Sequence, residues 1–407
     1  MIGREMAPSD PTHLADARVA RIITRLNIGG PSIQAAGLTN ALEANHFQTR
    51  LFHGRLGEGE GDMSYLLSPG ADAVFIPTLC RPLSPLNDLR AFVSLYAELR
   101  RLEPAIVHTH MAKAGLVGRL AAALYNLTRG AAPRARVVHT YHGHVLEGYF
   151  SPLMTRLFIT FERMLAHASD RIVAISPAIR VELAGTYRIG RDAQYRVIPL
   201  GFDLEPFAAI DAAARLRARD GLGLAKDAVV LSTVGRLTGI KQHRLFLDVV
   251  QRVVAAHPAT VALIAGDGEL RADLEAHAAA LGIGANVRFL GWRRDLDTIY
   301  AATDVFVLTS RNEGTPVALI EAMASGVPGV STDVGGVKDV IASSSVGALA
   351  PFGDGAALAA AVLTILADPA TRRAMGDAAR ASVLQRFGFG RLVADITRLY
   401  DEMLSEP

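Results

Sequence analysis

Hydrophobic and polar positions along the chain follow a pattern that repeats from end to end. Short runs rich in β-branched residues alternate with longer Ala- and Leu-rich stretches of helical period, which is typical of a parallel sheet covered by helices. In the first half, strands are predicted at 18–24, 49–53, 73–76, 105–109, 136–141, 171–175 and 195–198, with helices including 31–44, 86–102, 112–127 and 151–166.

The alternation starts again in the second half, after an Ala- and Arg-rich connector at 201–227. Strands are predicted at 229–234, 261–265, 287–289, 305–308 and 329–332, with helices at 244–256, 271–281, 296–302, 316–325 and 356–366. We therefore predict an α/β fold of two Rossmann-like domains facing each other across a cleft. The predicted parts are residues 1–203, residues 204–385, and a C-terminal helix at 386–407 that packs back on the first domain.

Length and composition agree with this division. A chain of 407 residues is too long for one ordinary hydrophobic core, and its 50% hydrophobic and 20% charged residues indicate a folded, soluble protein. The single cysteine, Cys80, cannot close an intrachain disulfide, and the N-terminus lacks the basic and apolar regions of a signal peptide. No apolar run approaches the roughly 18 residues of a spanning helix. We expect a cytoplasmic protein.

Charge is distributed unevenly between the halves. We count about 22 basic and 16 acidic residues before Gly201, and about 20 and 24 after it. The basic first half is explained by solvated helix faces or, alternatively, by contact with an anionic acceptor or a membrane surface. Basic clusters interleaved with aromatic residues are absent, so nucleic acid is not an expected partner.

A glycine turn follows the first predicted strand. Gly29 and Gly30 precede the helix predicted at 31–44, and adjacent glycines allow backbone amides to approach a phosphate at a helix N-terminus. A simple turn is the alternative. The spacing is not that of the GxGxxG dinucleotide fingerprint, so it gives no support to nicotinamide chemistry.

Histidines gather after two neighbouring predicted strands. Because alternate strand residues share a face, we expect His110 and His142 to project at the carboxyl edge of the sheet while His108 and His139 point into packing; His144 follows closely. A structural role and zinc ligation are alternatives, but no carboxylate or cysteine has metal-like spacing. Hydrogen bonding to a sugar hydroxyl or to an acceptor is the favoured interpretation.

Basic and aromatic residues follow the strands of the second half. Arg236 and Lys241 lie in a loop after 229–234, where a planar guanidinium and an ammonium suit a diphosphate. Gly268, Trp292 and Arg293 follow the next two strands and are candidates for contact with a base and ribose. Ordinary loop chemistry explains these three equally well.

The most informative stretch runs from Glu313 to Glu321. The amides near Thr315, Pro316 and Val317 open a predicted helix and can hold an anion. Glu321 is flanked by apolar residues, so its carboxylate requires a partner, which ribose hydroxyls would supply. Glu313 would meet sugar hydroxyls or a developing positive charge at the anomeric carbon. Purely structural glutamates are the alternative.

Together these motifs resemble the retaining family 4 glycosyltransferases of GT-B fold. The resemblance covers about Arg18 to Tyr400, and its motifs are Gly29-Gly30, Gly235-Arg236…Lys241 and Glu313-x7-Glu321. It implies that Arg236 and Lys241 neutralise the donor diphosphate, that Glu321 holds the ribose, and that Glu313 meets the donor sugar. It also implies that His142 stands beside the reacting sugar.

The resemblance further implies catalysis without a metal or other cofactor. Asp295-Leu296-Asp297 does match the DxD signature of metal-dependent glycosyltransferases. Because it leads into the helix predicted at 296–302, we interpret it as an N-cap followed by a first-turn acid.

The segment between the two glutamates departs from the family pattern. Gly314-Thr315-Pro316 stands where family members often carry an aromatic residue and a glycine, so the donor sugar is left open. The segment 142–150 resembles enzymes that build bacterial surface polysaccharides, which implies a lipid-linked acceptor. The apolar stretch 149–166 contains Arg156 and Arg163, and peripheral membrane contact and a packed interior helix are both open for it.

These observations predict retaining transfer of a hexose or N-acetylhexosamine from a UDP- or GDP-sugar to an acceptor hydroxyl. A nucleotide-sugar 2-epimerase of the same architecture is one rival, and a non-catalytic partner subunit is another. The predicted partners are the nucleotide sugar and a saccharide or lipid-linked acceptor, with the enzyme in the cytoplasm or peripheral at the inner face of the membrane.

Overall fold

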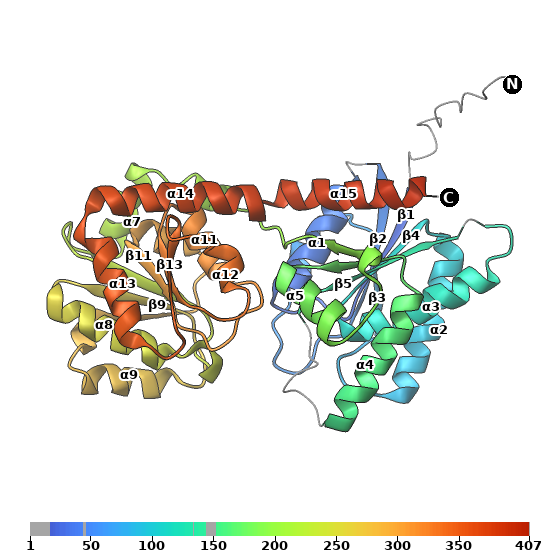
Figure 1. The fold of residues 1–407 in the computed structure, drawn as a ribbon, viewed down its shortest axis with the longest axis horizontal. Helices are drawn as coiled ribbons and strands as arrows, with labels where there is room; N and C mark the ends of the chain where they lie inside the picture. Colours follow the sequence, from blue (N-terminus) through green and yellow to red (C-terminus); the bar gives the residue numbers. More distant parts are fainter. Residues whose placement is uncertain (1–16, 44–45, 133, 144–151, 407) are drawn as a thin grey trace, which may run out of the picture. The chain divides into compact units, whose positions relative to one another are not determined.

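The computed structural model describes residues 17–43, 46–132, 134–143 and 152–406. It divides the chain into two compact units, each an α/β domain (Figure 1). The N-terminal unit comprises Met1–Leu200 and Gly390–Pro407, and the C-terminal unit comprises Gly201–Phe389. The chain thus changes unit close to the boundary predicted at 203, and its last residues belong to the first unit.

The N-terminal unit is built on a seven-stranded parallel sheet. Its strands are β1 (Ala17–Ile23), β2 (Phe47–Gly54), β3 (Ala73–Ile76), β4 (Ile106–His110), β5 (Arg136–Tyr141), β6 (Arg171–Ala174) and β7 (Tyr195–Val197). Their order is β3-β2-β1-β4-β5-β6-β7. The chain runs outward from β1 to β3 and then resumes on the other side of β1. The loops after β1 and β4 therefore flank a topological switch point, where open α/β sheets bind ligands.

Helices cover both faces of this sheet (Figure 1). They are α1 (Gly30–Leu42), α2 (Pro85–Leu102), α3 (Ala112–Thr128), α4 (Pro152–His167), α5 (Pro177–Val181) and α15 (Phe389–Ser405). On one face, Ile23 and Leu51 pack with Ala35 of α1, and Tyr400 of α15 packs edge-on against Phe47. On the other face, Ile22 and Val107 belong to a core shared with α2 and α3.

The C-terminal unit is built on a second parallel sheet. Its strands are β8 (Val230–Val234), β9 (Val261–Ala265), β10 (Val287–Gly291), β11 (Val305–Leu308), β12 (Gly329–Thr332) and β13 (Gly347–Ala350), in the order β10-β9-β8-β11-β12-β13. The order reverses between β8 and β11, so a second switch point lies between their carboxyl ends. Strand β13, an edge strand of sequence Gly-Ala-Leu-Ala, was not predicted, because it lacks the β-branched residues that mark the others.

Nine helices are described in this unit. They are α6 (Glu205–Ala208), α7 (Ala212–Gly221), α8 (His243–Ala256), α9 (Arg271–Ala280), α10 (Leu296–Ala302), α11 (Val317–Ala324), α12 (Val337–Val340), α13 (Gly355–Ala367) and α14 (Pro369–Phe387). The Ala- and Arg-rich connector contains α7, whose N-terminus is capped by Asp211 through the amide of Ala214. Arg215 and Arg219 of α7 both pair with buried Asp304, which precedes β11.

Candidate functional site

The loops after β8 and β11 meet at the switch point of the C-terminal unit. Lys241 donates from Nζ to Oε1 of Glu313 at 2.6 Å, and the hydroxyl of Ser310 donates to the same oxygen at 2.5 Å. The side chains of Lys241 and Glu313 are 27% and 10% exposed, so both are largely withdrawn from solvent. The structure therefore brings together the cation and the carboxylate that the sequence placed 72 positions apart.

Two further hydrogen bonds connect these two loops. The amide of Arg311 donates to the carbonyl of Ile240 at 2.8 Å, and the hydroxyl of Thr309 donates to the carbonyl of Lys241 at 3.1 Å. Gly235 begins the first loop with φ of 159°, and a Cβ there would lie 3.4 Å from Cε of Lys241. The lysine side chain thus runs directly over a residue without a side chain.

A second glycine pair supports Glu313 from the loop after β12. The amide of Gly336 donates to the carbonyl of Glu313 at 2.9 Å. A Cβ on Gly335 would lie 2.1 Å from that carbonyl oxygen, and one on Gly336 would lie 1.8 Å from the carbonyl oxygen of Gly314. Only glycines allow this close approach. The sequence predicted no role for this loop.

Helix α11 begins next to Glu313. Its first residue is Val317, one position later than the predicted start at 316, because Pro316 is the N-cap residue. Gly326 follows the end of the helix with φ of 76°. The first amides of an α-helix have no intrahelical acceptor, so the amides of Val317 and Ala318 are suited to an anion. Thr315 is half-buried and Pro316 is buried at this N-terminus.

Glu321 lies further along α11 and is half-buried. The hydroxyl of Tyr300 donates to its Oε2 at 2.9 Å, a contact that the sequence did not predict. Burial raises the pKa of Glu321 to about 7, and the hydrogen bond from Tyr300 only partly opposes this shift. A carboxylate that is only partly ionised at neutral pH is short of hydrogen-bond donors, as the prediction of ribose contact requires.

The remaining predicted residues of the C-terminal unit make fewer side-chain contacts or serve the packing of the loops. Arg236 is exposed and has no side-chain partner among the described residues, and Trp292 is 65% exposed. A Cβ on Gly268 would lie 2.6 Å from the carbonyl oxygen of Leu237, so this glycine has a structural reason to be there. None of these observations assigns a ligand to them.

The pairing of Arg293 with Asp295 corrects the interpretation of Asp295 as a capping side chain. Nε of Arg293 donates to Oδ1 of Asp295 at 2.7 Å. Asp295 is the N-cap residue of α10 by position, but its side chain makes no capping hydrogen bond, and Asp297 lies in the first turn as predicted. The carboxylate is diverted from capping because a guanidinium two residues away is a stronger partner than a backbone amide.

The carboxyl edge of the N-terminal unit carries the predicted histidines. His110 is fully buried, and its Nδ1 lies 3.0 Å from Nε2 of His142, which is half-buried. His108 is fully buried, as expected, but so is His110, which was expected to project at the edge, and the centroids of the two stacked rings lie 4.3 Å apart. Residues two apart share a strand face, so both lie on the face covered by α15. His139 lies on the opposite face and bonds Thr109.

His110 therefore has no free ring nitrogen with which to reach an acceptor. Its Nε2 lies 3.2 Å from NH1 of Arg21, a buried arginine of β1 for which the sequence predicted no role. A charged residue inside the apolar strand Ala17–Ile23 was the available signal. Met111, directly after His110, has φ of 69°, an uncommon conformation for a residue with a side chain. His144 lies outside the described residues.

Gly29 and Gly30 flank the same switch point. Gly29, with φ of 154°, is the N-cap residue of α1, and its amide lies 3.4 Å from the sulfur of Met63. A Cβ on Gly30 would lie 2.9 Å from Cδ1 of Leu200. The turn is thus tightly packed, and contact with phosphate stays a prediction.

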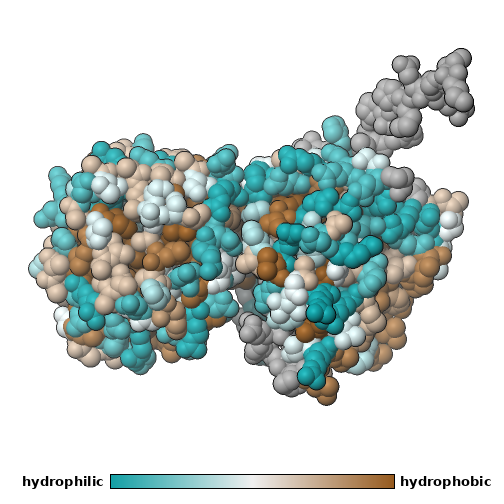
Figure 2. Space-filling view, viewed as in Figure 1, coloured by the Kyte–Doolittle hydropathy of each residue, from teal (hydrophilic) through white to brown (hydrophobic). Residues whose placement is uncertain are grey.

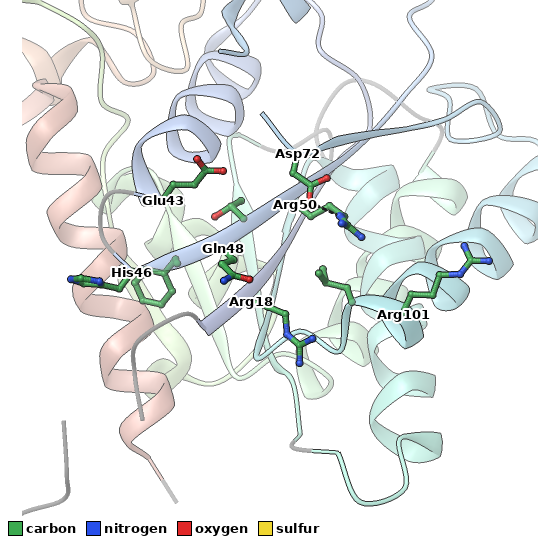
Figure 3. A pocket seen from close by; sticks show the side chains of 10 residues that line it. Arg18, Glu43, His46, Gln48, Arg50, Asp72 and Arg101 are labelled. Carbon is green, nitrogen blue, oxygen red and sulfur yellow. Dashed lines mark hydrogen bonds and ion pairs between the residues drawn. The ribbon is translucent and has the colours of Figure 1, made fainter. Parts of the chain in front are cut away.

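A pocket of about 560 Å³ opens at the opposite edge of this sheet (Figure 3). Arg18, Arg50 and Arg101 line it, but each is within 4 Å of a carboxylate, from Glu103, Asp72 and Glu98 respectively. The lining lies at the amino ends of β1, β2 and β3. This is the wrong edge for the ligand site of a parallel sheet.

No group of three or more His, Cys, Asp or Glu side chains among the described residues is arranged to hold a metal ion. No helix in the described part of the chain is both long and apolar enough to span a bilayer.

Comparisons with known proteins show the family to which the chain belongs. Residues 28–206 match the family model for glycosyltransferase family 4, and residues 215–382 match the model for glycosyl transferases group 1. The chain is 30% identical over 347 residues to the UDP-Gal:α-D-GlcNAc-diphosphoundecaprenol α-1,3-galactosyltransferase of Escherichia coli, a match that covers 84% of this chain and 87% of that one. The epimerase and the non-catalytic subunit are not favoured by these matches.

Solved structures show the same fold. A glycosyltransferase from Rickettsia africae superposes with a TM-score of 0.79 at 17% identity, covering 96% of this chain and all of that one. Anabaena HepE, in complex with UDP and glucose, superposes with a TM-score of 0.76 at 21% identity, covering 96% of this chain and 99% of that one. With both units matched by family models and 84% of the chain matched by a relative at 30% identity, this protein belongs to the family 4 glycosyltransferases and has the GT-B fold.

Proposed function

We propose that this enzyme transfers a hexose or N-acetylhexosamine from a UDP- or GDP-sugar, with retention of anomeric configuration and without a divalent cation, to a hydroxyl of a lipid-linked saccharide. The observation that carries the proposal is the contact between Lys241 and Glu313 at the switch point of the C-terminal unit. A nucleotide sugar joins an anionic diphosphate directly to the carbon that becomes cationic, so it needs a cation and a carboxylate side by side.

The donor is held by the C-terminal unit. Lys241 and exposed Arg236 neutralise the diphosphate together with the first amides of α11, and this combination supplies the charge that a metal would otherwise provide. Glu321 accepts hydrogen bonds from the ribose hydroxyls, and Trp292 offers an exposed ring to the base. Arg293 is tied to Asp295 and contributes through that pair.

The reaction exchanges one bond at the anomeric carbon for another. The bond to the diphosphate oxygen breaks, the bond to the acceptor oxygen forms on the same face, and the acceptor proton passes to the departing diphosphate. Glu313 stabilises the positive charge that develops at the ring. The E. coli relative supports retention, because its name specifies an α linkage formed from UDP-galactose, itself an α-glycoside.

The acceptor side involves a membrane surface. Leu153, Leu157, Phe161 and Met164 form an exposed apolar stripe along one face of α4, and the stripe is flanked by exposed Arg156 and Arg163. Leu86, Leu89 and Val93 form a second exposed stripe on α2. Hydrophobic residues gather along the right-hand margin of Figure 2, where Figure 1 draws α2 and α3.

An apolar face bordered by arginines is suited to the headgroup region of an anionic bilayer. Exposure of the apolar residues of the α4 stripe supports membrane contact over a fully packed interior helix for this part of the chain. The E. coli relative acts on a diphosphoundecaprenol-linked sugar, which supports an acceptor presented at a membrane.

The proposal is tested by incubating the purified enzyme with UDP-galactose and N-acetylglucosaminyl diphosphoundecaprenol, followed by assay of UDP release and NMR of the product linkage. We expect an α-linked product without added metal and in the presence of EDTA. A panel of other UDP- and GDP-sugars identifies the donor if galactose is not transferred. A β-linked product would overturn retention, and a new sugar nucleotide formed without acceptor would revive the epimerase.

A further inference from the structure

A continuous chain of hydrogen bonds runs from a buried arginine to His142. NH1 of Arg21 lies 3.2 Å from Nε2 of His110, and Nδ1 of His110 lies 3.0 Å from Nε2 of His142. Arg21 and His110 are fully buried, on adjacent strands of the N-terminal unit. The order of donors and acceptors along this chain follows from its first member.

Arginine can only donate, because its guanidinium has no acceptor atom and does not deprotonate in proteins. Nε2 of His110 must therefore accept, which places the proton of a neutral His110 on Nδ1. That proton is donated to Nε2 of His142, so Nε2 of His142 is an acceptor as well. A neutral His142 must then carry its own proton on Nδ1.

A second branch from the same arginine obeys the same logic. NH2 of Arg21 donates to the hydroxyl of Tyr400 at 3.1 Å, and this hydroxyl lies 2.7 Å from Nδ1 of His108. Having accepted from Arg21, the hydroxyl donates to His108, whose proton is then on Nε2. That nitrogen lies 2.7 Å from the hydroxyl of Thr140, which can accept. In both branches every hydrogen bond has one donor and one acceptor, so the assigned tautomers of the three histidines are compatible with one another.

The surroundings keep these rings neutral. Among the described residues, Arg21 pairs with no carboxylate, so its charge acts on the histidines uncompensated. Burial and the neighbouring charges hold the pKa of His108 and of His110 well below its ordinary value, and burial lowers the pKa of His142 to about 3. Nδ1 of His142 is buried and has no hydrogen-bond partner in the described part of the chain.

We infer that Arg21 and His110 are positioning residues that fix His142 in the tautomer with its proton on Nδ1, so that His142 offers a hydrogen-bond donor to a sugar hydroxyl oxygen. In this form His142 cannot serve as the base that takes the acceptor proton, since its one unprotonated nitrogen is occupied by His110. The inference rests on the proposed function for the presence of a sugar at this edge. The tautomer itself is a property of the ligand-free protein.

Nitrogen NMR of the ligand-free protein, labelled with ¹⁵N-histidine, tests the tautomer directly at pH 7. The His142 signals are assigned by their loss in His142→Phe. We expect one protonated and one unprotonated nitrogen, with the proton on Nδ1. A proton on Nε2, or a doubly protonated ring, would overturn the inference whatever the outcome of the activity assays.

Variants then test the chain of contacts. His110→Phe keeps an aromatic ring but removes the donor, so we expect the His142 tautomers to mix and kcat to fall about tenfold, the worth of one hydrogen bond. His110→Asn retains an amide donor near the position of Nδ1 and is expected to recover most of the loss. The control is Thr109→Val, which breaks a buried hydrogen bond to His139 on the other face of the sheet and should leave both readouts unchanged.

The same variants identify the sugar that receives the hydrogen bond. If it is the donor sugar, His110→Phe weakens binding of UDP-galactose but not of UDP, measured by calorimetry. If it is the acceptor, donor binding is unchanged and the KM for the lipid-linked saccharide rises. An unchanged kcat and unchanged binding of both substrates would show that the hydrogen bonds from Arg21 through His110 to His142 have a structural role only.

Discussion

Lys241 and Glu313 form a 2.6 Å ion pair across the switch point of the C-terminal sheet, and Ser310 donates to the same carboxylate oxygen. Before a donor binds, the two groups thus satisfy each other. A diphosphate must compete with Glu313 for the ammonium, and the contact therefore couples phosphate binding to the freedom of the carboxylate that we assign to the sugar.

Removal of the lysine should weaken nucleotide binding. A charge-assisted hydrogen bond contributes about 1.5–3 kcal/mol, so we expect Lys241→Ala to raise the Kd of UDP by about tenfold to a hundredfold, measured by calorimetry. Lys226→Ala removes an exposed lysine of the same unit and serves as the control. Equal affinities of the wild type and Lys241→Ala would exclude contact between this ammonium and the diphosphate.

Removal of the carboxylate should have the opposite effect on binding. In Glu313→Ala the ammonium of Lys241 is released, so we expect the Kd of UDP to stay the same or fall, whereas turnover falls at least a hundredfold because the developing charge loses its stabiliser. Steady-state kinetics and UDP titrations separate these effects. Glu269→Ala, which removes an exposed glutamate of the same unit, is the matched control. Normal turnover by Glu313→Ala would remove this residue from the mechanism.

Glu321 should make folding stability depend on pH in an unusual direction. Its pKa is raised by burial to about 7, so the native state disfavours the ionised form. The pKa of Glu321 is higher in the native state than in the unfolded state. Its contribution to folding stability is therefore fully present below the unfolded pKa near 4.5 and is lost as pH rises through 7. At pH 8 this amounts to about 3 kcal/mol in the absence of ligand.

Glu321→Gln removes that ionisation while keeping the side-chain size. We expect the variant to be more stable than the wild type at pH 8 and about equally stable at pH 4.5, measured by urea denaturation. We also expect it to bind UDP more weakly, because an amide accepts hydrogen bonds from ribose with one oxygen only. Glu275→Gln is the control, since Glu275 is exposed on α9. Unchanged stability at both pH values would show that Glu321 is not buried as an acid.

The sequence predicted those features that depend on local pattern. Strands β1 to β12 were each predicted, most of them from β-branched residues, and β13 was missed because Gly-Ala-Leu-Ala contains none. The sequence placed Lys241 and Glu313 after strands and assigned both to the donor, but it did not predict the direct contact between them. By contrast, Tyr300 and Arg21 act through side chains that reach across elements, and their partners Glu321 and His110 are 21 and 89 residues away. No local pattern encodes such a distance.

The exposed stripe on α4 should bind anionic bilayers. Transfer of Leu157 and Phe161 to the headgroup region removes apolar surface from water, so we expect the double substitution Leu157→Ser, Phe161→Ser to weaken sedimentation with phosphatidylglycerol vesicles at least tenfold. Binding should also weaken with added salt, because Arg156 and Arg163 contribute electrostatically.

The control for this surface is Leu216→Ser, which removes a leucine that is 64% exposed on α7 of the C-terminal unit. It should leave vesicle binding unchanged, so a loss in both variants would indicate a general effect of surface hydrophobicity. Transfer to a soluble, short-chain acceptor should be the same in the double variant and the wild type, because α4 is assigned to the bilayer and not to the reacting sugar. Loss of activity on the short-chain acceptor would instead place the stripe in acceptor recognition.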